Sequence, residues 1–486
     1  VTSTRAEEAM LSYFGRVNYD YDGKYLASVS MRADGSSRFA ENHRWGYFPG
    51  ASLGWNMHRE NFFTPARKYV SKLKLRASWG RTGNNSISLA DSRGLYGITG
   101  TTYLGEVGIL NTTLANADLV WETTESWDAG IDLGFFNNRL EILVDVYNKK
   151  TFDRLYDNKL PSTTGFSSIK CNYGSLGTKG IEVEVNAVPV STKDFTWNLG
   201  FNFTWYRTIV ISQPENGEEK NRTGGNYIYD PVTGTEIKVG GFAEGERFGA
   251  RYAYHYMGVY QTDEEAAAAP YDENAKGRTK HAGDAIWEDR NNDGYINAKD
   301  MVFMGYIRPD KTGGIPINFR WKKFTARVVA DFAMGHVINN GSLAYGLASI
   351  RNNYNTFKEA MTDCWTPENP NAKYPRFSPL SDADYATRNF TRAGESIGSS
   401  TSGQSNNSAF YHKGDFLAFR EISLAYSLPK SLTKMLRVSA LQIFGGVYNL
   451  GYLTGYDGMT PELYLGYDYG QYPRPREDSM GVNIPF

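Results

Sequence analysis

The segment from Asp289 to Asp300, DRNNDGYINAKD, carries oxygen-bearing residues at the spacing of an EF-hand calcium loop. Gly294 occupies the sixth position, where such a loop turns sharply, and Asp300 occupies the twelfth position in place of the usual bidentate glutamate. We therefore predict that this segment binds one Ca²⁺ ion with a structural role. The predicted ligands are Asp289, Asn291, Asp293, the carbonyl of Tyr295, Asn297 and Asp300.

Two interpretations of this loop stay open. Its flanks, GDAIWE and MVFMGYIRP, are short and apolar without a helical period, which excludes a sensor that works by moving two helices. Asp and Asn also favour Asx turns, and a network of such turns could hold the loop without metal. We expect the surrounding long segment to have no core of its own, so that a cation would supply its order.

The composition favours an all-β protein with many turns, since the chain contains 34 Tyr, 26 Phe, 10 Trp and 50 Gly among 486 residues. A net charge of −1 gives no argument for binding nucleic acid. No apolar run is long enough for a transmembrane helix. The two cysteines, Cys171 and Cys364, could form one bridge or remain free thiols.

Apolar and polar residues alternate with a period of two in several segments, which is typical of β-strands. We predict that Leu199, Phe201 and Phe203 face lipid and that Asn198, Gly200 and Asn202 face a barrel lumen. The alternating segments are longer than the usual strand of a soluble sandwich, which has about 5–6 residues. Their lengths are closer to the roughly 9–11 residues that a tilted transmembrane strand needs. The segments are 127–135, 181–187, 195–206 and 324–332.

Short and long connections alternate along the chain, as the periplasmic turns and extracellular loops of an outer-membrane barrel do. The short ones are Asp22-Gly23, Asn137-Asn138, Pro189 to Asp194 and Lys322-Lys323, and the long ones are 83–120, 157–177, 212–314 and 338–415. Placing every short turn on the periplasmic side gives about 13 strands. This count requires the strand-like segment from Phe248 to Tyr260 to lie in an outer loop.

The chain ends in MGVNIPF, an amphipathic strand pattern that finishes on Phe486. A terminal aromatic residue on such a strand resembles the barrel-assembly signal of outer-membrane proteins. An ordinary edge strand that ends in Phe is the alternative.

Several further segments resemble the barrel of TonB-dependent outer-membrane transporters of the SusC/RagA type. The likeness runs from about Leu11 to Phe486 and includes LKLRASWGRTGNNSI, WDAGIDLGFFNNRLEILVDVYNKKT, GTKGIEVEVNA and FREISLAYSLP. The calcium-like loop also resembles an extracellular element of this family. The resemblance implies an all-β transmembrane antiparallel barrel with long extracellular loops, of which residues 1–486 are the C-terminal portion, about 13 of about 22 strands.

The same resemblance implies segments that are not found in this sequence. They are a signal peptide, an N-terminal extension, a TonB-contacting segment, a plug domain and the first barrel strands. We expect the remaining polypeptide to carry the plug and these strands, with the break in an extracellular loop, where proteolysis is easiest.

The resemblance implies active import of an oligomeric nutrient, a glycan or a peptide, with energy from the TonB complex. The implied partners are a SusD-like surface lipoprotein that caps the barrel, the TonB complex and outer-membrane lipids. Dimers of transporter–lid pairs are expected, and nucleic acid is not. A passive or structural barrel and a soluble glycan-binding β-sandwich are the alternatives.

No catalytic constellation appears in the sequence. The six histidines lack a metal-binding spacing, neither cysteine lies in C-x-x-C, and G-x-S-x-G is absent. We therefore expect a protein that is not an enzyme, with no catalytic or cofactor-binding residues apart from the calcium ligands. Charged residues on the lumen side could contact substrate or form pairs across neighbouring strands, and we favour pairing. These residues are Asp128, Asp132, Glu182, Glu184, Arg327 and Asp331. Loop aromatics could grip substrate, contact a partner or pack within the loops; they are Tyr354, Phe357, Trp365, Tyr411 and Tyr464.

Overall fold

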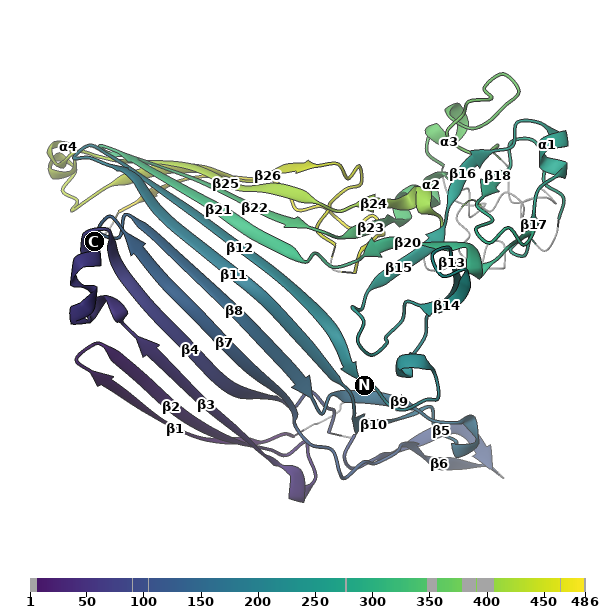
Figure 1. The fold of residues 1–486 in the computed structure, drawn as a ribbon, viewed down its shortest axis with the longest axis horizontal. Helices are drawn as coiled ribbons and strands as arrows, with labels where there is room; N and C mark the ends of the chain where they lie inside the picture. The colour runs from purple at the N-terminus through teal and green to yellow at the C-terminus, as the bar shows by residue number, and fades with distance from the viewer. Residues whose placement is uncertain are drawn as a thin grey trace. The chain divides into compact units, whose positions relative to one another are not determined.

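A computed structural model describes residues 7–89, 91–103, 105–275, 278–347, 356–377, 390, 406–463 and 465–484. Its main feature is an antiparallel sheet of thirteen strands, in which strands that follow one another along the chain are also neighbours in the sheet (Figure 1). This number and arrangement confirm the sequence prediction. The strands, in sheet order, are β1 (Met10–Tyr21), β2 (Tyr25–Ser36), β3 (Trp45–Trp55), β4 (Val70–Asn84), β7 (Glu122–Phe135), β8 (Leu140–Phe152), β11 (Ser175–Ser191), β12 (Phe195–Ser212), β21 (Lys311–Trp321), β22 (Phe324–Met334), β25 (Phe416–Ser427), β26 (Gln442–Thr454) and β28 (Glu477–Asn483).

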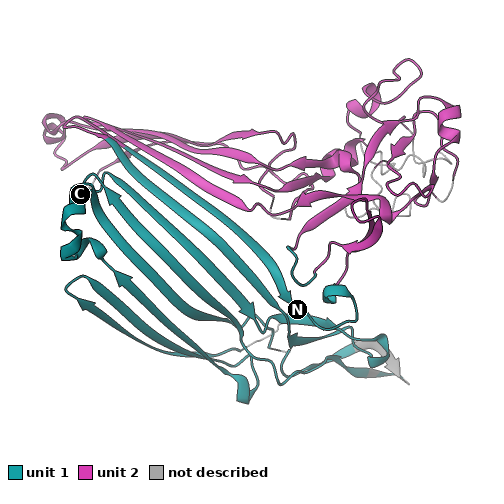
Figure 2. Cartoon of the chain, in the orientation of Figure 1, with its two compact units in different colours: residues 1–189, 198–222, 243–247 teal, residues 190–197, 223–242, 248–486 magenta. Residues whose placement is uncertain are grey.

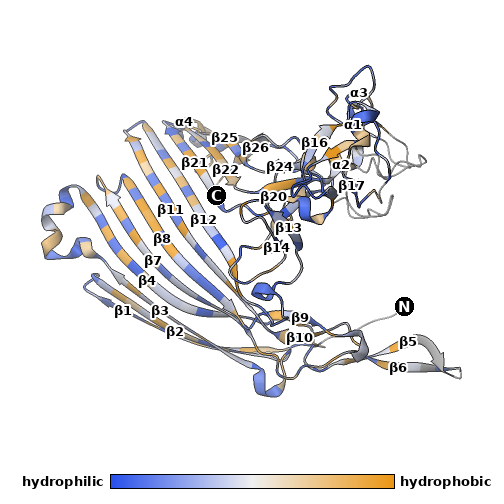
Figure 3. Cartoon of the chain, turned by 45° about the vertical axis from the view of Figure 1, so that its right-hand side comes forward, coloured by the Kyte–Doolittle hydropathy of each residue, from blue (hydrophilic) through white to orange (hydrophobic). Residues whose placement is uncertain are grey.

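The strand register places apolar residues on one face of the sheet and polar residues on the other. Ala77 pairs with Leu53 on one side and with Ala129 on the other, while Ser78 pairs with Ser52 and Asp128. Successive side chains point to opposite faces, so the two rows lie on opposite sides. Figure 3 shows the resulting alternation of hydrophobic and hydrophilic residues along β4, β7, β8 and β11.

The short turns have the backbone conformation that their sequences predict. Asp22 and Gly23 have φ of 55° and 59°, and Asn137 and Asn138 have φ of 57° and 60°. Asp, Asn and Gly tolerate this left-handed region best, which makes these residues suited to tight hairpins. Lys322 adopts φ of 51° in the turn between β21 and β22. Two connections at the same end of the sheet are longer. Two 3-10 helices, Met57–Arg59 and Asn61–Lys68, lie between β3 and β4, and helix α4 (Lys430–Met435) lies between β25 and β26.

Smaller sheets form within the long connections. Strands β15 (Ala250–Tyr254) and β16 (Tyr256–Val259) lie outside the large sheet, which confirms the placement of 248–260 in a loop. The other small strands are β5 (Leu95–Tyr103), β6 (Glu106–Thr113), β9 (Leu155–Lys159), β10 (Ser168–Asn172), β13 (Asn226–Asp230), β14 (Thr235–Val239), β17 (Tyr271–Asp272), β18 (Ala285–Trp287), β19 (Tyr295–Ile296), β20 (Met301–Tyr306), β23 (Val337–Asn340), β24 (Tyr411–Lys413) and β27 (Tyr467–Asp468). The loop helices are α1 (Asp263–Ala267), α2 (Gly341–Leu347) and α3 (Glu359–Thr362).

The chain divides into two compact units (Figure 2). Unit 1 contains residues 1–189, 198–222 and 243–247, and unit 2 contains residues 190–197, 223–242 and 248–486. Within unit 2 the long connections share a hydrophobic core around Trp287, Phe390 and Phe410, which are 5%, 3% and 0% exposed. The expectation that the long segments lack a core was wrong. The core joins residues far apart in the sequence, so no single segment displays it.

Candidate functional site

A depression of about 460 Å³ lies on the polar face of unit 1, over β1, β2, β3, β4 and β7. Its floor is a cross-strand row of small side chains, because Ser28 pairs with Ser52 and Ser52 pairs with Ser78. Asn18 and Asp128 continue this row at its two ends. Small residues in one row, with longer cationic side chains in the rows beside it, produce the hollow.

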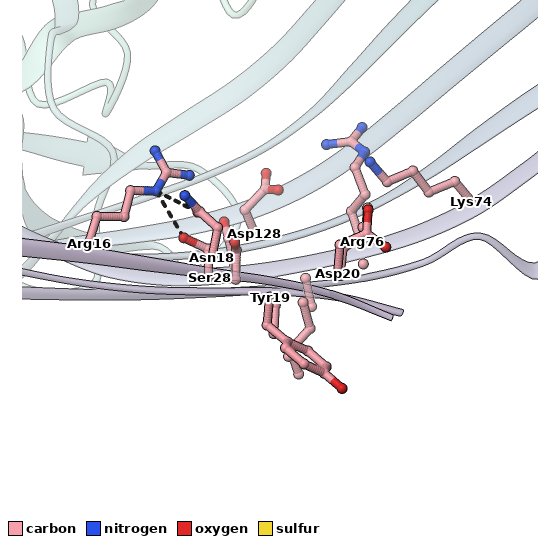
Figure 4. A pocket seen from close by; sticks show the side chains of 15 residues that line it. Arg16, Asn18, Tyr19, Asp20, Ser28, Lys74, Arg76 and Asp128 are labelled. Atoms are coloured by element: carbon pink, nitrogen blue, oxygen red, sulfur yellow. Dashed lines mark hydrogen bonds between the residues drawn. The ribbon is translucent and has the colours of Figure 1, made fainter. Parts of the chain in front are cut away.

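Three cationic side chains border this depression (Figure 4). Arg16 Nε donates to Asn18 Oδ1 at 2.9 Å and to Ser28 Oγ at 3.0 Å. Arg76 Nε donates to Asp132 Oδ1 at 2.7 Å, and its Nη2 donates to Asp145 Oδ2 at 3.0 Å. The remaining cation, Lys74, forms no ion pair in the described part of the chain.

Asp128 also lines the depression, and within the described ranges its carboxylate accepts no hydrogen bond. Figure 4 shows Asp128 on the same side of the sheet as Arg16, Lys74 and Arg76, while the ring of Tyr19 points to the other side. The depression therefore offers one ammonium group and one carboxylate for contact with a polar molecule.

The predicted calcium loop adopts a sharp turn in unit 2 around Gly294, whose φ is 81°. The carboxylate of Asp289 accepts hydrogen bonds from the backbone nitrogens of Asp293 at 3.2 Å and Gly294 at 2.9 Å. Asp300 accepts from the backbone nitrogens of Arg290 at 2.9 Å and Asn297 at 2.8 Å. Burial raises the pKa of Asp300 above its ordinary value.

These contacts match the Asx-turn interpretation, since Asp293 Oδ1 also accepts from the backbone nitrogen of Tyr295 at 2.9 Å. Asn297 Oδ1 accepts from Lys299 N at 2.9 Å and its amide donates to Glu273. Among the described residues, no group of three or more His, Cys, Asp or Glu side chains could hold a metal ion. The donor set nevertheless consists of oxygens, the atoms that Ca²⁺ prefers. The calcium site stays a prediction.

The loop aromatics that the structure describes mostly pack within unit 2. Burial raises the pKa of Tyr411 to about 12. Trp365 Nε1 donates to Gln261 Oε1 at 3.3 Å, and Phe357 remains 43% exposed. Tyr354, Tyr464 and the terminal Phe486 lie outside the described residues. Cys171 and Cys364 are both free thiols, which settles the question of a bridge.

Comparison with known proteins identifies the family to which this thirteen-stranded sheet belongs. A family model described as "TonB dependent receptor-like, beta-barrel" matches residues 2–450. The chain belongs to this family. Its location is the outer membrane, as the sequence analysis predicted. No helix in the described ranges is long and apolar enough to cross a membrane.

Curated relatives that are about 30% identical to this chain include two TonB-dependent receptors. The TonB-dependent receptor P3 of Formosa agariphila matches over 502 residues, which are 99% of this chain and 46% of the relative. The TonB-dependent receptor SusC of Bacteroides thetaiotaomicron matches over 497 residues, 100% of this chain and 44% of the relative. The chain thus spans about half the length of these relatives. Their names describe receptors, in agreement with the prediction that the chain is not an enzyme.

A solved structure titled as that of the RagAB peptide transporter has the same fold. The match has a TM-score of 0.75 at 24% identity and covers 98% of this chain and 48% of that one. The fold class is therefore that of a transmembrane antiparallel β-barrel, and the soluble β-sandwich is excluded.

In a TonB-dependent receptor barrel the apolar face contacts lipid and the polar face lines the lumen. The depression with Lys74 and Asp128 consequently lies on the lumen side. Three of the six lumen charges that the sequence singled out form ion pairs, as we favoured: Asp132, Arg327 and Asp331. Within the described ranges, no ion pair forms at Asp128, Glu182 or Glu184. Arg327 Nε donates to Glu421 Oε2 at 3.1 Å, and Asp331 binds Arg420.

Arg420 is the site residue that sequence analysis missed. The pairing of β25 with β22 and with β26 shifts register at this residue, which identifies a β-bulge. A bulge inserts one residue and re-aims the side chains beside it. The bulge lets Arg420 bind Asp331 on the lumen side, next to Glu421. The local sequence FLAFREISL carries one signal of the extra residue, because its alternation changes phase there. The apolar-face residues fall at odd positions up to Phe419 and at even positions from Ile422.

Proposed function

We propose that the chain forms part of an outer-membrane transporter that imports an oligomeric nutrient with TonB-derived energy. The observation that carries this proposal is the family match over residues 2–450 together with a polar lumen face. In the described part of the chain, ion pairs such as Arg76–Asp132 and Arg327–Glu421 line that face together with unpaired charges of both signs, which keeps it hydrated without a large net charge. A hydrated lumen suits a polar oligomer such as a glycan or a peptide.

The depression supports passage of such a substrate along the lumen wall. Lys74 can donate hydrogen bonds to hydroxyl or carbonyl oxygens, and Asp128 can accept them from hydroxyl or amide groups. Both groups retain free hydrogen-bonding capacity within the described residues. Both glycans and peptides carry such donor and acceptor groups, so the uptake assay must determine which of the two classes is the substrate.

We further propose that a SusD-like lipoprotein caps the extracellular side and that the TonB complex supplies the energy. The family relatives named SusC and RagAB support this arrangement. Unit 2 supports it physically, because a folded extracellular core presents a stable surface for a lid. Dimers of transporter–lid pairs belong to the same proposal.

An uptake assay tests the proposed function. Cells that produce the full-length protein containing this chain should take up labelled oligosaccharides or oligopeptides, and deletion of TonB should abolish uptake. Uptake that persists without TonB would instead indicate a passive barrel. Co-purification of a surface lipoprotein with the tagged transporter tests the lid, and its absence at low salt would contradict that part of the proposal.

Two substitutions test the role of the depression. Lys74→Gln and Asp128→Asn should each raise the KM of uptake several-fold and leave the amount of folded protein unchanged. The matched control is Lys323→Gln, which removes one charge in a short turn away from the depression. Equal KM values for all three variants and the unmodified protein would show that the depression does not contact substrate.

A further inference from the structure

The apolar face of unit 1 carries a groove of about 610 Å³ that the transport function does not use. Ala77 and Ala129 form its floor as direct cross-strand partners, and Leu53 and Val146 extend the row on either side. Trp79 and Trp127 form one wall, with ring centroids 5.9 Å apart. Small residues beside two large rings explain why a lipid-facing surface is hollow at this point.

A cluster of basic residues lies beyond the tryptophan wall, toward the long-loop ends of the strands. We call Arg81, Lys150, Lys179 and Arg207 the outer basic cluster; all four side chains are exposed. Arg81 pairs across the strands with Glu125, and Glu125 pairs with Lys150. In a barrel whose long loops are extracellular, this position corresponds to the outer membrane–water interface.

The register places the outer basic cluster on the same face as the groove. Arg81 lies two residues beyond Trp79 on β4, and Lys179 pairs with Asn148, which in turn pairs with Trp127. On β12, Arg207 lies over the Trp205 ring at 5.9 Å. Side chains two residues apart in a strand share a face, so the basic groups point to the lipid side.

The charges of this cluster are not balanced. Arg81 forms an ion pair with Glu125 at 2.7 Å, and its guanidinium lies over the rings of Trp79 at 5.8 Å and Phe152 at 5.7 Å. Lys150, Lys179 and Arg207 form no ion pair in the part of the chain that the structure describes. Three uncompensated cations at the membrane interface need an anionic partner.

We propose that the groove and the outer basic cluster together bind one phosphorylated, acylated glycolipid of the outer leaflet. The cluster binds the phosphate through charge-assisted hydrogen bonds, and one acyl chain lies against Ala77 and Ala129. The distance fits this arrangement, since four residues of strand separate Ala77 from Arg81, about 14 Å along β4. Neither feature alone specifies this ligand, but a phosphate site directly above an apolar groove matches a lipid with a phosphorylated sugar head.

Binding of lipids to the purified full-length protein tests the proposal. The probes are lipid A with one phosphate, dephosphorylated lipid A and phosphatidylglycerol, each in phosphatidylcholine nanodiscs, and native mass spectrometry counts the bound molecules. We expect retention of phosphorylated lipid A only. Equal retention of dephosphorylated lipid A or of phosphatidylglycerol would overturn the proposal.

The variant K150Q/K179Q/R207Q removes the uncompensated charges. Each Lys or Arg near an anionic surface contributes about fivefold in binding, so affinity for phosphorylated lipid A should fall roughly a hundredfold. The control K149Q/K322Q/K323Q removes the same number of charges from the lumen side and a short turn and should bind as the unmodified protein does. Heat-dependent electrophoretic mobility verifies that each variant is folded.

The variant A77F/A129F fills the groove and leaves the basic residues in place. Retention should fall several-fold, because the acyl chain loses its contact surface. Unchanged retention in both this variant and the charge variant would overturn the proposal. A loss of protein dimers without any loss of lipid would also overturn it, since the groove would then be an interface between two copies.

Discussion

The guanidinium of Arg420 binds the carboxylate of Asp331 from the extra residue of a β-bulge, with Nη2 and Oδ2 2.8 Å apart. The same side chain binds Glu462, which lies in the connection between β26 and β28, and Arg474 binds the other oxygen of Glu462 at 3.0 Å. The bulge therefore attaches an outer loop to the lumen side of the strands.

Removing this attachment should loosen the loop. We predict that Arg420→Gln raises hydrogen exchange across residues 455–463, because Glu462, whose side chain is 13% exposed, loses its nearest cation. The local free energy of opening should fall by about 1–3 kcal/mol. Arg476→Gln is the control, since its ion pair with Asp478 is exposed and should contribute less than about 1 kcal/mol. Equal exchange in both variants would contradict the attachment.

The two faces of β12 should respond differently to a charge. Phe201→Arg should cost roughly 2–4 kcal/mol in the free energy of unfolding from lipid vesicles, because it places a charge in the hydrocarbon region. Asn202→Arg should be tolerated, since its side chain enters the hydrated lumen. Urea titration of protein refolded into vesicles measures both values, and similar costs would show that the faces are assigned incorrectly.

The extracellular core of unit 2 should depend on its buried aromatic residues. Phe410 is 0% exposed, so Phe410→Ala should destabilise this core by about 3–5 kcal/mol through a cavity and lost burial. Limited proteolysis should then cut the loops while the barrel strands stay protected. Tyr472→Ala, at a side chain 91% exposed, is the control. A protease-resistant Phe410→Ala variant would mean that the core tolerates the cavity.

Acid should loosen the base of the loop between β22 and β25. Burial holds the pKa of His336 below its ordinary value, despite the opposing charge of Asp415. A histidine with a lowered folded pKa stabilises the fold above its unfolded pKa of about 6.5, and this contribution is lost as pH falls below that value. Hydrogen exchange in Val337–Asn340 should therefore increase between about pH 6.5 and pH 5. The increase should disappear in His336→Gln and persist in His43→Gln.

The calcium loop gives a prediction that separates its two interpretations. If Asp289, Asp293 and Asp300 bind Ca²⁺, titration should show one site of roughly 10⁻⁴–10⁻³ M affinity. Asp293→Asn should weaken it, and Glu264→Gln on α1 should not. Thermal melting of the loop that is identical with calcium and with a chelator would favour the Asx-turn network alone.

The sequence by itself determined the elements that follow local rules. Alternation at 195–206 predicts a two-faced strand because side chains in a strand alternate whatever the strand packs against. Asp22-Gly23 and Asn137-Asn138 predict hairpins because few residues tolerate a positive φ. The alternation of tight and long connections, together with these strand patterns, predicted the number of strands in the large sheet, which is thirteen. It also predicted that residues 248–260 lie outside this sheet.

Only the tertiary structure decided what depends on residues far apart in the chain. One hydrophobic core contains Trp287, Phe390 and Phe410, which come from three segments far apart in the sequence. The sequence of each segment alone does not predict that these side chains pack together. The row of Ser28, Ser52 and Ser78 beside Lys74 exists only once three strands, β2, β3 and β4, fix their register. Arg420 lies where the alternation changes phase, but only the pairing of β25 with β22 shows that its side chain reaches Asp331. Local patterns follow from the backbone geometry of each strand, whereas these sites follow from which strands and loops become neighbours.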